Sequence, residues 1–294
     1  MGAHVPIGSE LTRLTGRSCD PAPERRVGGG NISTAYAWRC GAELMFVKTG
    51  PPAMAAAFAA EARGLSMLQG AAALRVPQVR AQGTAAEAAF LALEWLELRP
   101  PDGECAARAG AQLAALHAHP GPRFGLEHDN FIGRTPQQNA WAADWVAFFR
   151  ERRLRPQLEL AARHGFGELR STGEALLAAV PALLAGHSPA PALLHGDLWG
   201  GNWASTGDGV PVVFDPAAYY GDPEADLAMT ALFGGFGEEF YQAYCELRPR
   251  RAGWRERADL YNLYHVLNHA NLFGGAYVQQ ACGLMRHLLA LTRG

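Results

Sequence analysis

The first third of the chain alternates short apolar runs with polar turns, a pattern typical of a small antiparallel β-sheet. One Ala-rich stretch breaks the alternation. Residues 54–68 place Phe58, Leu65 and Leu68 near helical spacing, so we expect an amphipathic helix there. Residues 1–25, interrupted by two prolines, predict no regular element. The expected strands lie within residues 27–38, 44–48, 76–79 and 89–96.

The rest of the chain follows helical periods. Trp141, Trp145, Phe148 and Phe149 recur at intervals of three and four residues, which predicts the packing stripe of a buried helix. Pro223, with acidic residues just after it, marks the start of another helix. The other expected helices lie within residues 105–117, 151–164, 172–186 and 258–273.

A stretch rich in proline and glycine, residues 98–103, separates the two patterns and is the best linker in the chain. The sequence therefore predicts an α+β protein with two lobes. Residues 1–97 form a lobe built on a small antiparallel sheet with one helix, and residues 98–294 form a larger, mainly helical lobe. A chain of 294 residues with 49% hydrophobic and 18% charged residues can bury a sizeable core.

Charge and cysteine usage narrow the class of protein. The net charge of −2 gives no basic surface for nucleic acid or an anionic membrane. No apolar run approaches the ~18 residues of a membrane span, and the N-terminus lacks a signal pattern, so we expect a cytoplasmic protein. The cysteines are five, scattered, and without a C-x-x-C pair. That usage favours free thiols in a reducing compartment over a disulfide framework or a zinc site.

The chemistry concentrates in one stretch of the larger lobe. An apolar run leads into His195-Gly196-Asp197, Asn202 follows Asp197 by five positions, and a second apolar run ends at Asp215. This spacing is a phosphoryl-transfer signature, which makes ATP and Mg²⁺ the expected cofactors. We expect Asp197 to accept the proton of the attacking hydroxyl. Asp197 and Asn202 share one tight loop, so both can face the same small volume. Asn202 and Asp215, the latter at the end of a neighbouring strand, are the expected Mg²⁺ ligands.

The smaller lobe supplies a matching set of candidates for nucleotide binding. Gly28, Gly29 and Gly30 lie between two strands, where their backbone N–H groups could approach a polyphosphate, and Ser33 could add a hydroxyl donor. A glycine triplet alone is more typical of a hairpin turn. Lys48, at the end of the next strand, favours the phosphate-binding interpretation because kinases place an ammonium group there.

Two further positions complete that expectation. Glu61, on the Ala-rich helix, is the candidate carboxylate partner of Lys48, and its alternative is a solvated helix charge. Glu94 to Leu96 would form the hinge whose backbone reads an adenine edge, and this assignment rests on position alone.

The acceptor must be small. Only eight positions separate Asp215 from Pro223, which leaves no room for the activation segment on which a protein kinase builds its peptide platform. Gly196 replaces the arginine that would hold a phosphorylated loop. A small hydroxyl compound is therefore the expected acceptor.

Several polar residues have more than one interpretation. Gln137 and Asn139, in a loop before the aromatic helix, are candidates for lining a sugar site. His269, with His265 and Asn268 on an otherwise apolar helix, either faces substrate or is a satisfied core group. Asp226 is more typical of a structural anchor for the catalytic loop than of a catalyst.

Longer motifs surround these residues. They are Leu193-Leu194-His195-Gly196-Asp197-Leu198-Trp199-x-Gly201-Asn202, Asp215-Pro216-Ala217 with Tyr220-Gly221 and Glu224-x-Asp226-Leu227-Ala228, Leu232-Phe233-Gly234-Gly235-Phe236, and Pro136-Gln137-x-Asn139-x-Trp141. Together they resemble the fructosamine (ketosamine-3-) kinases over nearly the whole chain. The resemblance implies a two-lobed protein-kinase-like fold and ATP-dependent phosphorylation of the third-carbon hydroxyl of sugars attached to amines, which reverses glycation.

Trp199 and the Gly-Gly-Phe motif distinguish this family from the aminoglycoside and choline kinases. Trp199 offers an aromatic face to the sugar or its amine-linked carbon. The expected partner is a small sugar-amine or a glycated protein, with a monomer as the expected assembly. Two positions depart from the family pattern: Asn31 replaces a cysteine of the glycine loop, and Gly200 replaces a serine of the catalytic loop. The alternatives are an aminoglycoside- or choline-type phosphotransferase and a nucleotide-binding pseudokinase scaffold.

Overall fold

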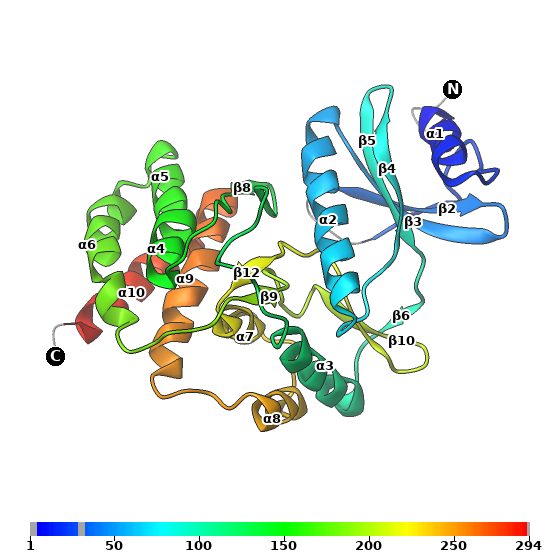
Figure 1. Cartoon of the computed structure of the whole chain (residues 1–294). Helices are drawn as coiled ribbons and strands as arrows, with labels where there is room; N and C mark the ends of the chain where they lie inside the picture. The colour runs from blue at the N-terminus through cyan, green and yellow to red at the C-terminus, as the bar shows by residue number, and fades with distance from the viewer. Residues whose placement is uncertain (1–4, 29–32, 293–294) are drawn as a thin grey trace.

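The structure is a computed structural model that describes residues 5–28 and 33–292. Figure 1 shows two lobes, with a five-stranded sheet in the N-terminal one. The sheet is antiparallel throughout, in the order β1-β2-β3-β5-β4. Its strands are β1 (Arg25–Val27), β2 (Thr34–Cys40), β3 (Glu43–Gly50), β4 (Val79–Ala85) and β5 (Ala88–Glu94).

Helices cover both faces of this sheet (Figure 1). Along β5, Leu91 and Leu93 pack toward helix α2 (Ala55–Ala71), whereas Phe90 and Ala92 pack toward helix α1 (Val5–Thr15). The alternation follows from the two-residue period of a strand. The prediction of a single helix in this lobe was wrong: α1 ends at Thr15, before Pro21 and Pro23, so these prolines do not interrupt it, and it buries Ile7 and Leu11 against the sheet.

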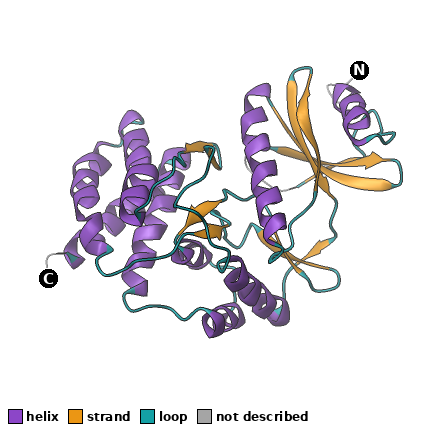
Figure 2. Cartoon of the chain, in the orientation of Figure 1, coloured by secondary structure: helices purple, strands orange, loops and turns teal. Residues whose placement is uncertain are grey.

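The C-terminal lobe is mainly helical, which confirms the predicted α+β class (Figure 2). The helices of the C-terminal lobe are α3 (Gly103–Leu116), α4 (Trp145–Phe148), a π-helical segment (Phe149–Leu154), α5 (Arg155–Arg163), α6 (Gly167–Leu183), α7 (Pro223–Leu232), α8 (Glu238–Leu247), α9 (Trp254–Phe273) and α10 (Ala276–Leu291). In the N-terminal lobe, a short 3₁₀ turn, Pro52–Met54, precedes α2.

Short strands position the loops of this lobe. β9 (Ala192–Leu194) pairs with β12 (Tyr219–Gly221), and β7 (Asn130–Ile132) pairs with β8 (Thr135–Gln137). β10 (Trp203–Thr206) pairs with β11 (Pro211–Val213) and with β6 (Leu98–Arg99). β6 lies in the predicted linker, so the chain joins the sheet of the larger lobe as soon as it leaves the smaller one.

One apolar core crosses between the lobes. It combines Phe58 and Leu65 of α2 with Leu113 of α3, Leu193 of β9 and Val213 of β11. α2 also lies against the loop after Asp215, since a Cβ added at Gly64 would be 3.1 Å from Cγ of Pro216. Packing therefore fixes α2, and with it Glu61, against the catalytic half of the molecule.

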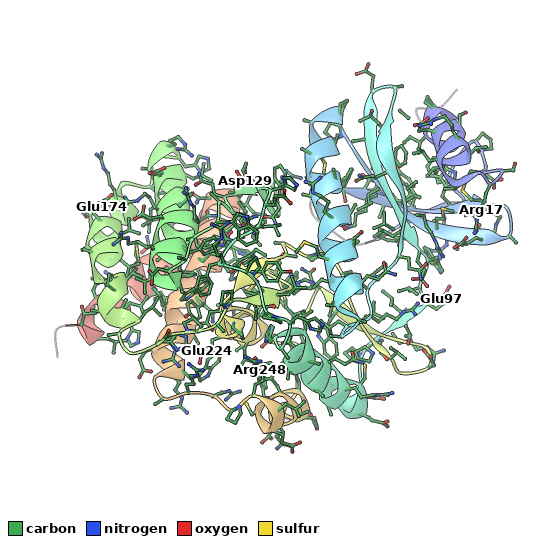
Figure 3. All side chains as sticks on the ribbon, viewed as in Figure 1. Arg17, Glu97, Asp129, Glu174, Glu224 and Arg248 are labelled. Atoms are coloured by element: carbon green, nitrogen blue, oxygen red, sulfur yellow. A yellow bond between two sulfur atoms is a disulfide. The ribbon has the colours of Figure 1, made fainter. Side chains whose placement is uncertain are left out.

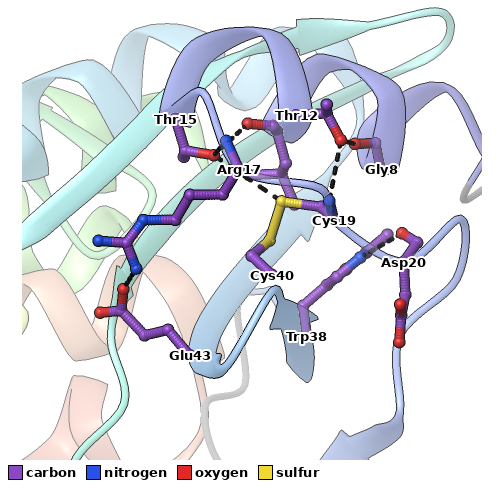
Figure 4. The surroundings of a disulfide bond; sticks show 10 residues. Gly8, Thr12, Thr15, Arg17, Cys19, Asp20, Trp38, Cys40 and Glu43 are labelled. Atoms are coloured by element: carbon purple, nitrogen blue, oxygen red, sulfur yellow. Dashed lines mark hydrogen bonds and ion pairs between the residues drawn. A yellow bond between two sulfur atoms is a disulfide. The ribbon is translucent and has the colours of Figure 1, made fainter.

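The expectation of free thiols was wrong for two cysteines. Cys19 and Cys40 form a disulfide, because residues 18–20 run antiparallel to the end of β2 (Figure 4). Gly41 N–H donates to the Ser18 carbonyl at 2.7 Å, and Asp20 N–H donates to the Arg39 carbonyl at 2.9 Å. Cys105, Cys245 and Cys282 are free thiols. Among the described helices, none is long and apolar enough to cross a membrane.

Candidate active site

The catalytic loop, residues 195–202, connects β9 to β10 and is held by Asp226 of α7. The Asp226 carboxylate accepts the N–H of His195 at 2.7 Å and the N–H of Gly196 at 2.8 Å, as expected of a structural anchor. Gly196 has φ +81°, and a Cβ there would lie 2.2 Å from the Ala217 carbonyl oxygen. Glycine is therefore required at this position, which explains why the arginine of protein kinases is absent.

Asp226 stays ionised although it is buried. Burial raises the pKa of the Asp226 carboxyl. The hydrogen bond and charge interaction with His117, together with the N–H of Gly196, outweigh burial and bring that pKa below its ordinary value. His117, also buried, contacts Asp226 at 3.3 Å and the Tyr244 hydroxyl at 2.8 Å. His117 is therefore a core residue that supports the anchor Asp226.

His195 links the catalytic loop to the segment that carries Asp215. Its Nδ1 accepts the N–H of Asp197 at 3.3 Å, so Nε2 carries the proton and donates to the Phe214 carbonyl at 3.1 Å. Burial lowers the pKa of His195, which keeps the ring neutral. The histidine of the motif is thus a positioning group, since both ring nitrogens are used within the fold.

The structure brings Asp197, Asn202 and Asp215 together. Asn202 Nδ2 donates to the Asp197 carbonyl at 2.8 Å and to its Oδ2 at 3.3 Å, and Phe214 N–H donates to the Asn202 carbonyl at 3.0 Å. Asp215 follows β11 with φ +58°, a conformation rare for a residue other than glycine and one found at functional sites. Burial, with repulsion from Asp215, raises the pKa of Asp197 to about 7.

Lys48 reaches this centre from the other lobe. Its ammonium donates to Glu61 Oε1 at 2.8 Å and to Asp215 Oδ1. Burial lowers the pKa of Lys48, but the carboxylates of Asp215 and Glu61 outweigh it, so the net pKa is raised and the ammonium stays charged. For Glu61, burial outweighs Lys48 and raises the pKa. Glu61 is therefore placed as the partner of Lys48, and the solvated alternative does not describe it.

The donor set suits a divalent cation. Asn202 uses its amide nitrogen in the hydrogen bonds above, which leaves its oxygen for a ligand, and the Asp215 side chain is 43% exposed. A carboxylate and an amide oxygen are ligands that Mg²⁺ prefers. The residues present therefore fit a magnesium ion next to bound phosphates.

The nucleotide-binding candidates divide into three groups. Gly29 and Gly30, like Asn31, lie outside the described residues. Gly28 and Ser33 flank that gap, between β1 and β2. Leu96 lies in the stretch between β5 and β6 that joins the lobes.

The prediction that the Glu94 backbone amide binds an adenine edge needs a correction. Its N–H already donates to the Gln78 carbonyl at 2.8 Å. Its carboxylate bonds Arg75 at 2.7 Å and the N–H of Gln78 at 3.2 Å. Those contacts hold the end of β5 in place, so a hinge role of the Glu94 amide is excluded in this conformation.

Gln137 and Asn139 also need a correction as residues that line a sugar site. Both are buried, and their side chains meet at Asn130, whose Oδ1 accepts from each at 2.7 Å. Gln137 also donates to the Ala217 carbonyl at 3.2 Å and accepts from the Tyr264 hydroxyl at 2.6 Å. These amides hold the backbone just after Asp215, so their place is behind the site and not on its surface.

Sequence reasoning missed Arg153, which completes that network. Its guanidinium is fully buried, donates to Asn139 Oδ1 at 2.8 Å, and lies 4.0 Å from the ring centroid of Tyr219 and 4.6 Å from that of Phe148. Aromatic faces and carbonyl groups stabilise the cation here. The sequence offered one signal: Arg153 lies in an aromatic-rich helical segment. Without the structure, such an arginine is ordinarily expected to face solvent.

Trp199 stands beside this centre, two positions after Asp197, with 38% of its surface exposed. Its ring lies over Gly201, where a Cβ would come within 2.3 Å of it. Gly200 packs against the backbone of Gly234 and Gly235; a Cβ at Gly200 would be 2.7 Å from the Gly234 carbonyl oxygen. The serine expected at position 200 would therefore clash, and its replacement permits this close approach. His269 lies nearby, half-buried against Phe233 at 4.9 Å.

A second group of potential metal ligands lies on the underside of the larger lobe, near Glu224 and Arg248 in Figure 3. It comprises His187, Asp222 and Glu224 and borders a cavity of about 70 Å³. Its carboxylates are already used: Tyr261 OH donates to Asp222 at 2.5 Å, and Arg257 forms a bidentate pair with Glu224 at 2.6 and 2.9 Å. This group fixes the start of α7 and offers no open site for a cation.

Comparison with known proteins gives one consistent answer. The family model for fructosamine kinase matches residues 5–291. A "probable ketoamine kinase" of Synechocystis sp. is 43% identical, covering 97% of this chain and 96% of its own. The chloroplastic protein-ribulosamine 3-kinase of Oryza sativa subsp. indica is 38% identical, covering 97% of this chain and 82% of its own.

Solved structures agree with that result. The structure of a candidate fructosamine-3-kinase from Thermobifida fusca has a TM-score of 0.85 at 38% identity, covering 97% of this chain and 98% of its own. An aminoglycoside phosphotransferase in a ternary complex with AMP-PNP and hygromycin B has a TM-score of 0.60 at 18% identity, with 97% of each chain covered. The second likeness establishes the kinase-like fold alone.

Proposed function

The chain belongs to the fructosamine kinase family of ATP-dependent phosphotransferases, and we propose that it phosphorylates the 3-hydroxyl of ketosamines, the ribulosamine or fructosamine adducts of amines. Phosphorylation at that position destabilises the adduct, so the activity is a deglycation repair. One observation carries the proposal. The centre of Asp197, Asn202, Asp215, Lys48 and Glu61 has an exposed aromatic ring, Trp199, directly beside its expected base.

In the proposed mechanism each residue has a distinct task. Asp197 accepts the proton of the attacking hydroxyl. Lys48, held by Glu61, binds phosphate oxygens, and the Gly28 backbone N–H and the Ser33 hydroxyl donate to them. Asn202 and Asp215 would hold Mg²⁺, which neutralises charge on the nucleotide phosphates when bound.

The short path from Asp215 to α7 supports a small acceptor. Residues 219–221 of this path form β12, paired with β9, and α7 begins at Pro223. No segment remains to form a peptide platform, so the acceptor side next to Trp199 stays open. An open aromatic face suits the apolar face of a sugar.

Two other functions make different predictions. An aminoglycoside- or choline-type kinase would prefer a polycation or a quaternary amine, and a pseudokinase scaffold would turn over no acceptor. ADP-release kinetics on a ketosamine, kanamycin and choline separate the three. We expect kcat/KM to be far higher for the ketosamine. Comparable or higher values for kanamycin or choline would overturn the ketosamine assignment and leave the kinase mechanism standing.

A further inference from the structure

The tetrapeptide Leu-Phe-Gly-Gly occurs twice in this chain, at residues 232–235 and 272–275. Each copy ends a helix: Phe233 follows the last residue of α7, and Phe273 is the last residue of α9. All four glycines have positive φ, from +56° to +97°, so each helix stops abruptly after its phenylalanine. The same local chemistry thus leaves a phenylalanine at the end of two different helices.

Both phenylalanines converge on one histidine. The ring centroid of His269 lies 4.9 Å from that of Phe233 and 5.7 Å from that of Phe273. Tyr277, in the first turn of α10, is 5.0 Å from His269 and 6.2 Å from Phe273. At the other end, Phe233 lies 6.0 Å from Trp199 of the catalytic loop. These five residues form what we call the aromatic row: Trp199, Phe233, His269, Phe273 and Tyr277.

The row is exposed and uncharged. Phe233 is 37% exposed and Phe273 is 56% exposed, and both are among the few large apolar side chains that remain exposed in the described chain. Burial lowers the pKa of His269 and so favours the neutral imidazole, and its Nδ1 donates to the His265 carbonyl at 2.8 Å. Exposed aromatic surface that is continuous with a catalytic loop indicates a binding surface.

We propose that the outer half of the row, Phe273 and Tyr277, binds an apolar substituent on the amine of the acceptor and so determines which amines are accepted. The proposal rests on the proposed function, because it takes Trp199 as the contact for the sugar. Successive ring contacts lead away from Asp197, where the sugar hydroxyl would react. The group bound at the far end of the row is therefore the substituent carried on the amine. An uncharged aromatic surface matches an aliphatic or aromatic group and stabilises the adjoining ammonium through the ring faces.

Two acceptors test this: ketosamines of one sugar with methylamine and with phenethylamine, which differ only in the amine substituent. We expect the wild type to have the higher kcat/KM for the phenethylamine adduct. Phe273→Ala should reduce that value about 5- to 10-fold, as loss of a large apolar contact predicts, and leave the methylamine adduct within about twofold. Tyr277→Ala should shift the same ratio in the same direction.

Leu247→Ala is the matched control, because Leu247 is 62% exposed at the end of α8 and outside the row. It should change neither value. A phenethylamine-to-methylamine ratio that stays within twofold of wild type in both row variants overturns the inference while the function stands. If the wild type phosphorylates neither adduct, the proposed function itself fails and the inference fails with it.

Discussion

The reaction centre and the aromatic row are neighbours with opposite physical character. In the centre, which comprises Lys48, Glu61, Asp197, Asn202 and Asp215, every side chain is tied to another by a hydrogen bond or ion pair. The row, which begins only two positions after Asp197, contacts mainly through ring surfaces and leaves Phe233 and Phe273 exposed. The fold thus fixes the groups that we propose transfer phosphate and leaves the proposed acceptor side free.

This difference teaches where each kind of change should act. A substitution in the centre breaks charge-assisted hydrogen bonds in a buried network, so it should lower turnover for every acceptor. A substitution in the row removes apolar surface that only the bound acceptor covers, so it should change affinity and preference.

Asp197→Asn should lower kcat about 10²- to 10⁴-fold for every acceptor, because general-base assistance is lost. Mg-ATP affinity, measured by calorimetry, should change little, since the amide keeps the size of the carboxylate. More than about a tenth of the wild-type rate would remove Asp197 from the role of base.

Asp226→Asn should lower kcat by about 10- to 100-fold without contacting any substrate. An amide cannot accept from both His195 N–H and Gly196 N–H, and a buried unsatisfied N–H costs about 1–3 kcal/mol. The melting temperature should fall in parallel. Asp208→Asn, on an exposed turn, is the control and should behave as wild type. Normal turnover in the Asp226 variant would show that the catalytic loop keeps its geometry without this anchor.

Trp199→Ala should raise KM for a ketosamine about tenfold, with kcat within about threefold of wild type, because the ring provides apolar contact rather than a proton or a charge. Steady-state kinetics at saturating Mg-ATP measure both constants. A large fall in kcat at unchanged KM would join Trp199 to the reaction centre and erase the contrast between the two regions.

His265, which lies behind the row, should make stability depend on pH. Burial lowers its pKa from 6.5 to about 3, so the unfolded chain takes up this proton first. Its contribution is therefore fully present above pH 6.5 and is lost as the pH falls from 6.5 toward 3. Between pH 7.5 and 5.5 the loss is about 1.4 kcal/mol.

Urea unfolding at those two pH values measures this contribution. His265→Asn should reduce the pH-dependent change in unfolding free energy by about 1.4 kcal/mol. An unchanged pH dependence in the variant would mean that the imidazole is not held neutral by burial.

Four of the five residues of the centre sit at the end of a short apolar run or on a fixed loop spacing, and these patterns predicted that they would lie together. Asp197 and Asn202 share one loop, Asp215 follows a strand, and Lys48 lies near the end of another, whereas Glu61 was predicted from the helix that follows. Patterns of this kind depend on neighbouring residues, so they can be recognised without knowing the tertiary contacts. The kinase-like α+β fold followed from the same patterns and from the family resemblance.

What the sequence did not predict depends on contacts between distant segments. α1 ends before Pro21 and Pro23, so these prolines do not prevent a helix there, and the pairing of residues 18–20 with β2, which joins Cys19 to Cys40, links positions 21 residues apart. In the sequence Asn139 is a polar loop residue. Only the fold shows that it accepts a hydrogen bond from Arg153. The aromatic row likewise needs α7, α9 and α10 to be brought side by side.

The central claim, phosphate transfer to the third-carbon hydroxyl of a ketosamine, is tested most directly by identifying the product. A ketosamine of methylamine would be incubated with the wild-type protein and Mg-ATP, and the product examined by ³¹P and ¹H NMR, with Asp197→Asn as the matched control. We expect one phosphate per acceptor, coupled to the proton on carbon 3, followed by release of free methylamine. A phosphate on any other oxygen, or hydrolysis of ATP with no phosphorylated acceptor, would contradict it.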